Sequence, residues 1–125
     1  MAIQAILETG ALSIFGGGLA TPKFAFNNGI TASTTDGTVL IAVTGKKIRV
    51  LDFKISTVTA ATTIIFNSKP AGAGTAISAL FNAPVGVFGS GFNPLGHFET
   101  NLNEGLTATT GAGNTVTVQI TYIEV

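Results

Sequence analysis

Residues 115–122 read TVTVQITY, in which apolar and polar side chains alternate without exception. One parity carries Val116, Val118, Ile120 and Tyr122, and the other carries only threonine and glutamine. Period-two alternation is typical of a β-strand with one buried and one polar face. Residues 105–110, GLTATT, precede this segment across the turn GAGN, so we expect the two segments to form a hairpin.

From Lys23 onward the sequence pattern is typical of β-strands throughout. We expect strands or short apolar runs at residues 23–32, 38–44, 46–59, 62–67, 76–81 and 85–88. In the first of these, Phe24, Phe26, Ile30 and Ala32 share a parity, interrupted by Asn27-Asn28-Gly29, and are expected on one face. Turn signals recur about every 8–12 residues and no long window has helical periodicity, which predicts an all-β fold. We expect a single-domain β-sandwich of jelly-roll-like type.

The segment 46–59, KKIRVLDFKISTVT, contains a change of phase. Ile48 and Val50 are apolar at even positions, whereas Leu51, Phe53 and Ile55 are apolar at odd positions. A shift of one residue exchanges the buried and exposed faces of a strand. The pattern therefore predicts either a β-bulge at Val50-Leu51 or a strand that crosses a corner of the sandwich.

Residues 1–22 differ from the rest of the chain, because Gly16-Gly17-Gly18 interrupts any regular element there. We expect an N-terminal arm over residues 1–22, with an ordinary edge strand and glycine linker as the alternative, and a sandwich domain over residues 23–125. A signal peptide is not expected, since no Lys or Arg precedes Lys23 and Glu8 interrupts the apolar run.

Composition limits the possible partners. The 125 residues suit one domain, the formal net charge is zero, and only 10% of the residues are charged. No global field therefore attracts nucleic acid or anionic lipid. No stretch reaches the roughly 20 apolar residues of a membrane span. The chain has no cysteine, which excludes disulfides and thiolate metal sites.

The strongest candidates for chemistry are His97, the only histidine, and Glu99. In a strand they would share a face about 6–7 Å apart, as an acid–base pair or two metal ligands. A catalytic zinc needs three protein ligands, and no other carboxylate forms a motif with this pair. We therefore expect no catalytic, cofactor-binding or metal site and no small-molecule substrate, and take His97 as a half-exposed histidine hydrogen-bonded at a strand start.

Three other features have both an ordinary and a functional interpretation. The basic cluster Lys46, Lys47, Arg49 and Lys54 is either a solvated strand edge or a docking patch for an acidic protein surface. The glycines of residues 86–91 lack the lysine and the strand–helix context of a phosphate loop. The aromatic residues in glycine-rich context are either core residues under loops or interface anchors; they are Phe15, Phe88 and Phe92.

The segment FNPLGHFET, residues 92–100, predicts a structural corner. Pro94 fixes φ and cannot continue a central strand, Asn93 is a common turn starter, and Gly96 relieves the backbone. Phe92 and Phe98 are then expected to hold the two sides of the corner in the core.

Several short segments, taken in order, resemble small virion structural proteins of tailed bacteriophages. They are GKKIRV at 45–50, FNPLGHFET at 92–100, Gly105-Leu106 and the C-terminal ITYIEV at 120–125. Such proteins often carry G-K-x-I-R-V, N-P-x-G-[aromatic]-F-x-T, a G-E-A-L-like start to the last hairpin, and T-Y-x-E-[V/I]. The resemblance covers roughly residues 38–125. His97 stands where an aromatic residue is common.

Several proteins of this kind are similar to capsid decoration, or cement, proteins with β-sandwich folds. The resemblance implies a homo-oligomer, expected to be a trimer, made in the host cytoplasm and bound to the major capsid protein on the virion exterior. The expected capsid contacts are Phe15, Lys46, Lys47, Arg49 and Phe88. The alternative function is a tail or fibre module that recognises a host-surface glycan, although the chain has no Trp and Tyr122 is expected to face inward.

Overall fold

The computed structural model describes residues 12–13 and 19–125 and contains only strands there as regular elements. The strands are β1 (Leu12–Ser13), β2 (Leu19–Ala20), β3 (Lys23–Ile30), β4 (Gly37–Leu40), β5 (Ile48–Thr57), β6 (Thr62–Lys69), β7 (Thr75–Ala76), β8 (Phe81–Ala83), β9 (Gly86–Gly89), β10 (Phe98–Glu99), β11 (Gly105–Thr110) and β12 (Val116–Glu124). The predicted all-β class is confirmed. In this part of the chain no helix is long and apolar enough to cross a membrane.

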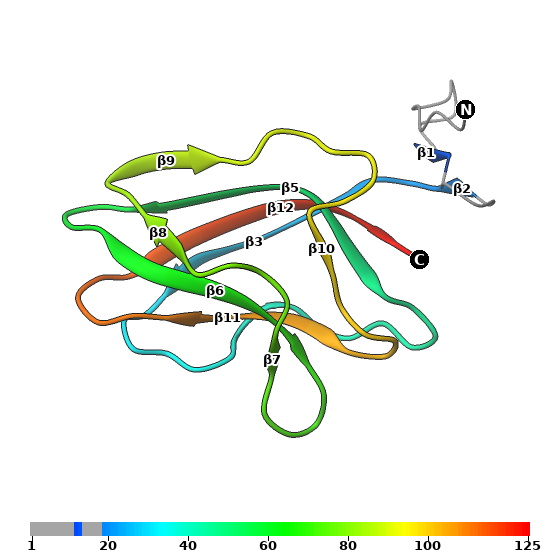
Figure 1. The fold of residues 1–125 in the computed structure, drawn as a ribbon, viewed down its shortest axis with the longest axis horizontal. Helices are drawn as coiled ribbons and strands as arrows, with labels where there is room; N and C mark the ends of the chain where they lie inside the picture. The colour runs from blue at the N-terminus through cyan, green and yellow to red at the C-terminus, as the bar shows by residue number, and fades with distance from the viewer. Residues whose placement is uncertain (1–11, 14–18) are drawn as a thin grey trace.

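Two antiparallel sheets pack face to face as a β-sandwich (Figure 1). The first sheet has the order β10-β5-β12-β3, and β9 also pairs with β5. The second has the order β4-β11-β6-β7, and β8 also pairs with β6. A separate pair, β1 and β2, lies at the end of the sandwich near the C-terminus.

The core lies between the two sheets. Phe66 of β6 is fully buried and stacks on Phe98 with ring centroids 4.9 Å apart. Phe53 of β5 meets Phe66 edge-on at 5.6 Å. The predicted alternation of residues 116–122 is confirmed, because Val116, Val118, Ile120 and Tyr122 are all buried in this core.

The predicted hairpin of residues 105–122 is wrong. β11 pairs with β4 and β6 in the second sheet, whereas β12 pairs with β3 and β5 in the first. The segment GAGN therefore crosses from one sheet to the other at the end of the sandwich. Gly111 N donates to Thr63 O at 2.8 Å, and Ser33 N donates to Gly111 O at 2.9 Å, so neighbouring loops hold this connection.

The change of phase in residues 46–59 is a β-bulge, as one of the two predicted alternatives states. Thr121 lies opposite Asp52 and Tyr122 opposite Val50, so Leu51 is the extra residue of β5. Ile48, Val50, Phe53 and Ile55 all reach the main core. Leu51 instead forms a second small core with Ile123, against which Ala20 and Val125 pack.

A second irregularity, in β3, overturns the expected placement of its aromatic residues. Val116 lies opposite Ile30 and Val118 opposite Asn27, so Asn28 and Gly29 both face Thr117. This bulge places Ile30 in the core but turns Phe24 and Phe26 outward, where they are 73% and 66% exposed. The predicted strand at 38–44 also ends early, because β4 stops at Leu40.

Candidate functional site

The segment 92–98 forms a tight turn between β9 and β10. Asn93 Oδ1 accepts a hydrogen bond from Leu95 N at 3.0 Å, and Gly96 N donates to Asn93 O at 2.9 Å. Gly96 has φ of 90°, and a Cβ there would lie 2.6 Å from Cγ of Arg49. Phe98 packs against the core. The expectation that Phe92 is held in the core is wrong, because half of its side chain is exposed.

His97 lies directly before β10 and is exposed. Its Nε2 is 2.9 Å from the carbonyl oxygen of Gly91, and its ring meets that of Phe53 edge-on at 5.6 Å. Its neighbour Glu99 pairs with basic residues instead. Among the described residues, no group of three His, Asp or Glu side chains is placed to hold a metal ion.

The basic cluster is divided by its carboxylate partners. Glu99 accepts a hydrogen bond from Arg49 Nε at 2.6 Å and lies 3.4 Å from Lys47 Nζ. Lys54 Nζ lies 3.3 Å from Asp52 on the same strand. Arg49, Lys47 and Glu99 therefore form one compact group across β5 and β10, and Lys46 is exposed in the preceding turn.

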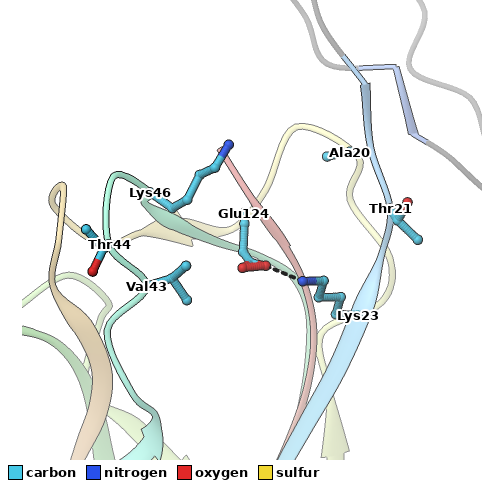
Figure 2. A pocket seen from close by; sticks show the side chains of 7 residues that line it. All are labelled: Ala20, Thr21, Lys23, Val43, Thr44, Lys46 and Glu124. Atoms are coloured by element: carbon cyan, nitrogen blue, oxygen red, sulfur yellow. Dashed lines mark hydrogen bonds and ion pairs between the residues drawn. The ribbon is translucent and has the colours of Figure 1, made fainter.

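A polar cavity of about 330 Å³ lies where β2, β3, the turn before β5 and the C-terminal strand meet (Figure 2). Lys23 and Glu124 point toward one another inside it, and Lys46 extends away from this ion pair. The hydrogen bond that Lys23 Nζ donates to the Glu124 carboxylate, and the negative charge of that carboxylate, raise the pKa of Lys23 above its usual value. Burial raises the pKa of Tyr122, the next residue but one from Glu124.

A larger, mostly apolar cavity of about 460 Å³ opens between the two sheets beside β8 and β9. Its lining is aromatic and aliphatic with a few polar groups: Phe53, Ile77, Ser78, Ala79, Phe81, Phe88, Ser90, His97 and Phe98. Both serine hydroxyls already bond to backbone, since Ser90 Oγ accepts from Phe53 N and Ser78 Oγ from Phe66 N, each at 2.9 Å. The cavity therefore offers mainly apolar contact.

Asp36 is the centre of a polar network on the outer face of the second sheet. Its Oδ1 accepts hydrogen bonds from Asn67 Nδ2 and Thr107 Oγ1, both at 3.0 Å, and its Oδ2 accepts from Gly74 N at 2.9 Å. Burial alone would raise the pKa of Asp36, but these hydrogen bonds and the charge of Lys69 outweigh it and lower the pKa. The network joins the start of β4 to β6, β11 and the loop before β7.

An exposed aromatic strip lies on the outer face of the first sheet. Phe24 and Phe26 project from β3, which is the outermost strand of that sheet. They stand beside Thr121 and Gln119 of β12, their register partners. We call residues 23–27 of β3, with these two side chains, the β3 strip.

The structure brings together only some of the residues singled out in the sequence. Lys47, Arg49 and Gly96 meet at one end of the first sheet, whereas Phe88 lines the apolar cavity and is 42% exposed. Phe15 lies outside the described residues. Sequence reasoning missed the β3 strip, for which the signal was the Asn-Asn-Gly interruption. It also missed the Asp36 network, which joins residues distant in sequence.

Comparison of the chain with protein-family models, curated proteins and solved structures gave no match.

Proposed function

We propose that the chain is a structural protein of a phage virion, a capsid decoration protein that binds the outer shell and stabilises contacts between major capsid subunits. The observation that carries the proposal is the amount of apolar surface on a small sandwich. Among the described residues the exposed large apolar side chains are Leu19, Phe24, Phe26, Ile41, Val58, Leu80, Val85, Val87, Phe88, Phe92, Leu95 and Leu102. Where such side chains share a face, as Phe24 and Phe26 do on β3, they form an apolar patch of the kind found at protein–protein contact sites.

The proposed mechanism is the addition of buried area between neighbouring shell proteins. Burial of apolar surface contributes about 25 cal/mol per Å². Association entropy and desolvation remove part of this gain, so each copy adds only a modest stabilisation. Repetition over many equivalent positions would raise the free energy needed to rupture the shell.

Two groups of residues are the proposed capsid contacts. The first is the charged end of the first sheet, with Lys46, Lys47 and Arg49, where Glu99 partly compensates the charge. The second is Phe88 at the rim of the apolar cavity. Residues 1–22 are proposed as an arm that reaches a neighbouring subunit, and Phe15 would contribute to that contact.

We also propose that this β-sandwich is of the jelly-roll type. This classification is supported by the chain crossing between the sheets several times: β3, β5, β9, β10 and β12 belong to the first sheet, and β4, β6, β7, β8 and β11 to the second. Double-sheet jelly rolls of eight strands are common in viral capsid domains.

The test is to locate the protein in purified virions that contain it. Quantitative mass spectrometry should give hundreds of copies per particle, and a cryo-EM map should show a small sandwich repeated over the icosahedral shell. A handful of copies, with density only at the tail, would support the alternative glycan-recognition module, which glycan-array binding by the isolated protein would then test. Absence from the particle would overturn both.

A further inference from the structure

The β3 strip combines an open strand edge with two exposed aromatic side chains. Among the described strands, β3 pairs only with β12, so one side of its backbone is without a strand partner. Phe24 and Phe26 are the two most exposed phenylalanines described. An open strand edge is a template for pairing with another strand.

The sequence around the strip limits where such pairing can occur. Pro22 precedes the strip and has no N–H to donate to a new ladder. The bulge at Asn28-Gly29 ends the regular strand on the other side. Residues 23–27 are therefore the segment available for an added strand, and a two-fold pairing that uses all five residues is centred on Ala25.

The strip is complementary to itself. In an antiparallel pairing centred on Ala25, Phe24 of one copy lies opposite Phe26 of the other, and Ala25 lies opposite Ala25. Directly opposed residues point to the same face of a sheet, so the four phenylalanines would form one row on the outer face. Lys23 would face Asn27, so no like charges are opposed, and its own charge is already paired with Glu124.

We propose that a second copy of this chain binds the β3 strip by two-fold antiparallel pairing of residues 23–27 around Ala25, which joins the first sheets of two molecules into one continuous sheet. A fully buried aromatic side chain covers about 150–250 Å². The four rings would lie in one row and cover one another only in part, so the contact, even with the paired backbones, stays below the range of about 1,200–2,000 Å² for stable complexes. The dimer is accordingly weak and concentration-dependent.

This inference goes beyond the proposed function, because it concerns the isolated protein and needs no capsid. The contact is isologous and gives pairs, whereas the resemblance to decoration proteins implies a trimer. The mass of the assembly in solution distinguishes a dimer from a trimer.

The first experiment is sedimentation equilibrium of the full chain over a concentration series. We expect a monomer–dimer equilibrium, and the double variant Phe24→Ser, Phe26→Ser should weaken it at least tenfold. Ile41→Ser is the matched control, since Ile41 is as exposed as Phe24 at 73% but lies beyond the end of β4. A strict monomer, a trimer, or equal weakening by both variants would overturn the proposal.

The second experiment tests the register and does not remove the aromatic residues. The chain has no cysteine, so Ala25→Cys introduces a single thiol. Opposed residues in an antiparallel pair have Cα atoms about 4.5–5.5 Å apart, within disulfide range. Gln119→Cys is the control, because Gln119 is exposed on β12, one strand further in, and three strand spacings of roughly 4.8 Å place it at least about 14 Å from its counterpart. Rapid oxidation of the first variant alone supports the pairing, and similar rates for both contradict it.

Discussion

Asp36 shows how one polar side chain can connect parts of a sheet that are distant in sequence. Its φ of 54° lies in the left-handed region, which aspartate and asparagine tolerate better than most residues. Its carboxylate accepts hydrogen bonds from Asn67, Thr107 and Gly74. The side chain thus connects the turn before β4 to the outer face of the second sheet.

Replacing Asp36 with Asn should therefore keep the backbone and remove part of the network. An amide cannot accept all three hydrogen bonds, so we expect a loss of about 1.5–3 kcal/mol in the free energy of unfolding at pH 7. Urea denaturation measures this loss. A change of less than about 0.5 kcal/mol would mean that the network contributes little to stability.

The same residue predicts a dependence of stability on pH. The folded pKa of Asp36 is lowered, whereas the unfolded chain has a value near about 3.9. The stabilisation from this group is therefore complete above the unfolded value and is lost as the pH falls through the folded pKa. Urea denaturation of the wild type from pH 5 down to the acid range should show this loss, and Asp36→Asn should show less of it. Equal slopes for both proteins would contradict the prediction.

Gly96 is the subject of the third prediction at the level of single residues. Alanine there would have a positive φ, and its Cβ would meet Arg49 at 2.6 Å, beside the Arg49–Glu99 ion pair. We expect a loss of about 1–3 kcal/mol. Gly45→Ala is the control, since Gly45 also has a positive φ but has nothing within 4 Å of the added Cβ. If thermal unfolding shows equal losses, the contact with Arg49 is unimportant.

The bulge in β5 is a feature of a whole element and could be predicted from sequence. It required only the even-to-odd change at Val50-Leu51, which is visible within one strand. The bulge in β3 could not be predicted, because Asn27-Asn28-Gly29 marks an interruption without showing whether one residue is added to the ladder. That single residue decides whether Phe24 and Phe26 face the core or solvent.

A substitution at Leu51 tests the bulge in β5. Leu51 has the same odd parity as Phe53 and Ile55, yet the bulge keeps it out of their core, and it is completely buried against Ile123 instead. Leu51→Ala should reduce the free energy of unfolding by about 2–4 kcal/mol, since it leaves a cavity in the second small core. Val58→Ala, at a position that is 79% exposed in the next loop, should change stability by less than about 0.5 kcal/mol. A small effect at Leu51 would contradict the bulge geometry.

At the level of the whole molecule, local sequence explains the elements better than their connections. The GAGN connection has the composition of a hairpin turn, yet it joins strands of different sheets. Partners distant in sequence decide whether this segment is a hairpin turn or a crossing between sheets. β11 pairs with β4 and β6, whereas β12 pairs with β3 and β5. The corner at Asn93–Pro94–Gly96 was predictable because its signals are local. The apolar cavity was not, because its lining comes from residues 53 to 98.

This connectivity predicts that the two sheets unfold together. Neither sheet is a continuous piece of chain, since the chain crosses from one sheet to the other several times, and both sheets share one core. Loss of one sheet would therefore expose the buried face of the other, and a single cooperative transition is expected.

Tyr122 is a convenient probe of this cooperativity, because it is the only tyrosine, the chain has no tryptophan, and its side chain is buried in the first sheet. Its near-ultraviolet dichroism should be lost at the same temperature as the far-ultraviolet signal of both sheets, at one fixed protein concentration. Calorimetry should give equal calorimetric and van't Hoff enthalpies and a heat-capacity change of about 1.5 kcal/mol/K. An earlier loss of the Tyr122 signal would show that the first sheet opens separately, in conflict with a core that both sheets share.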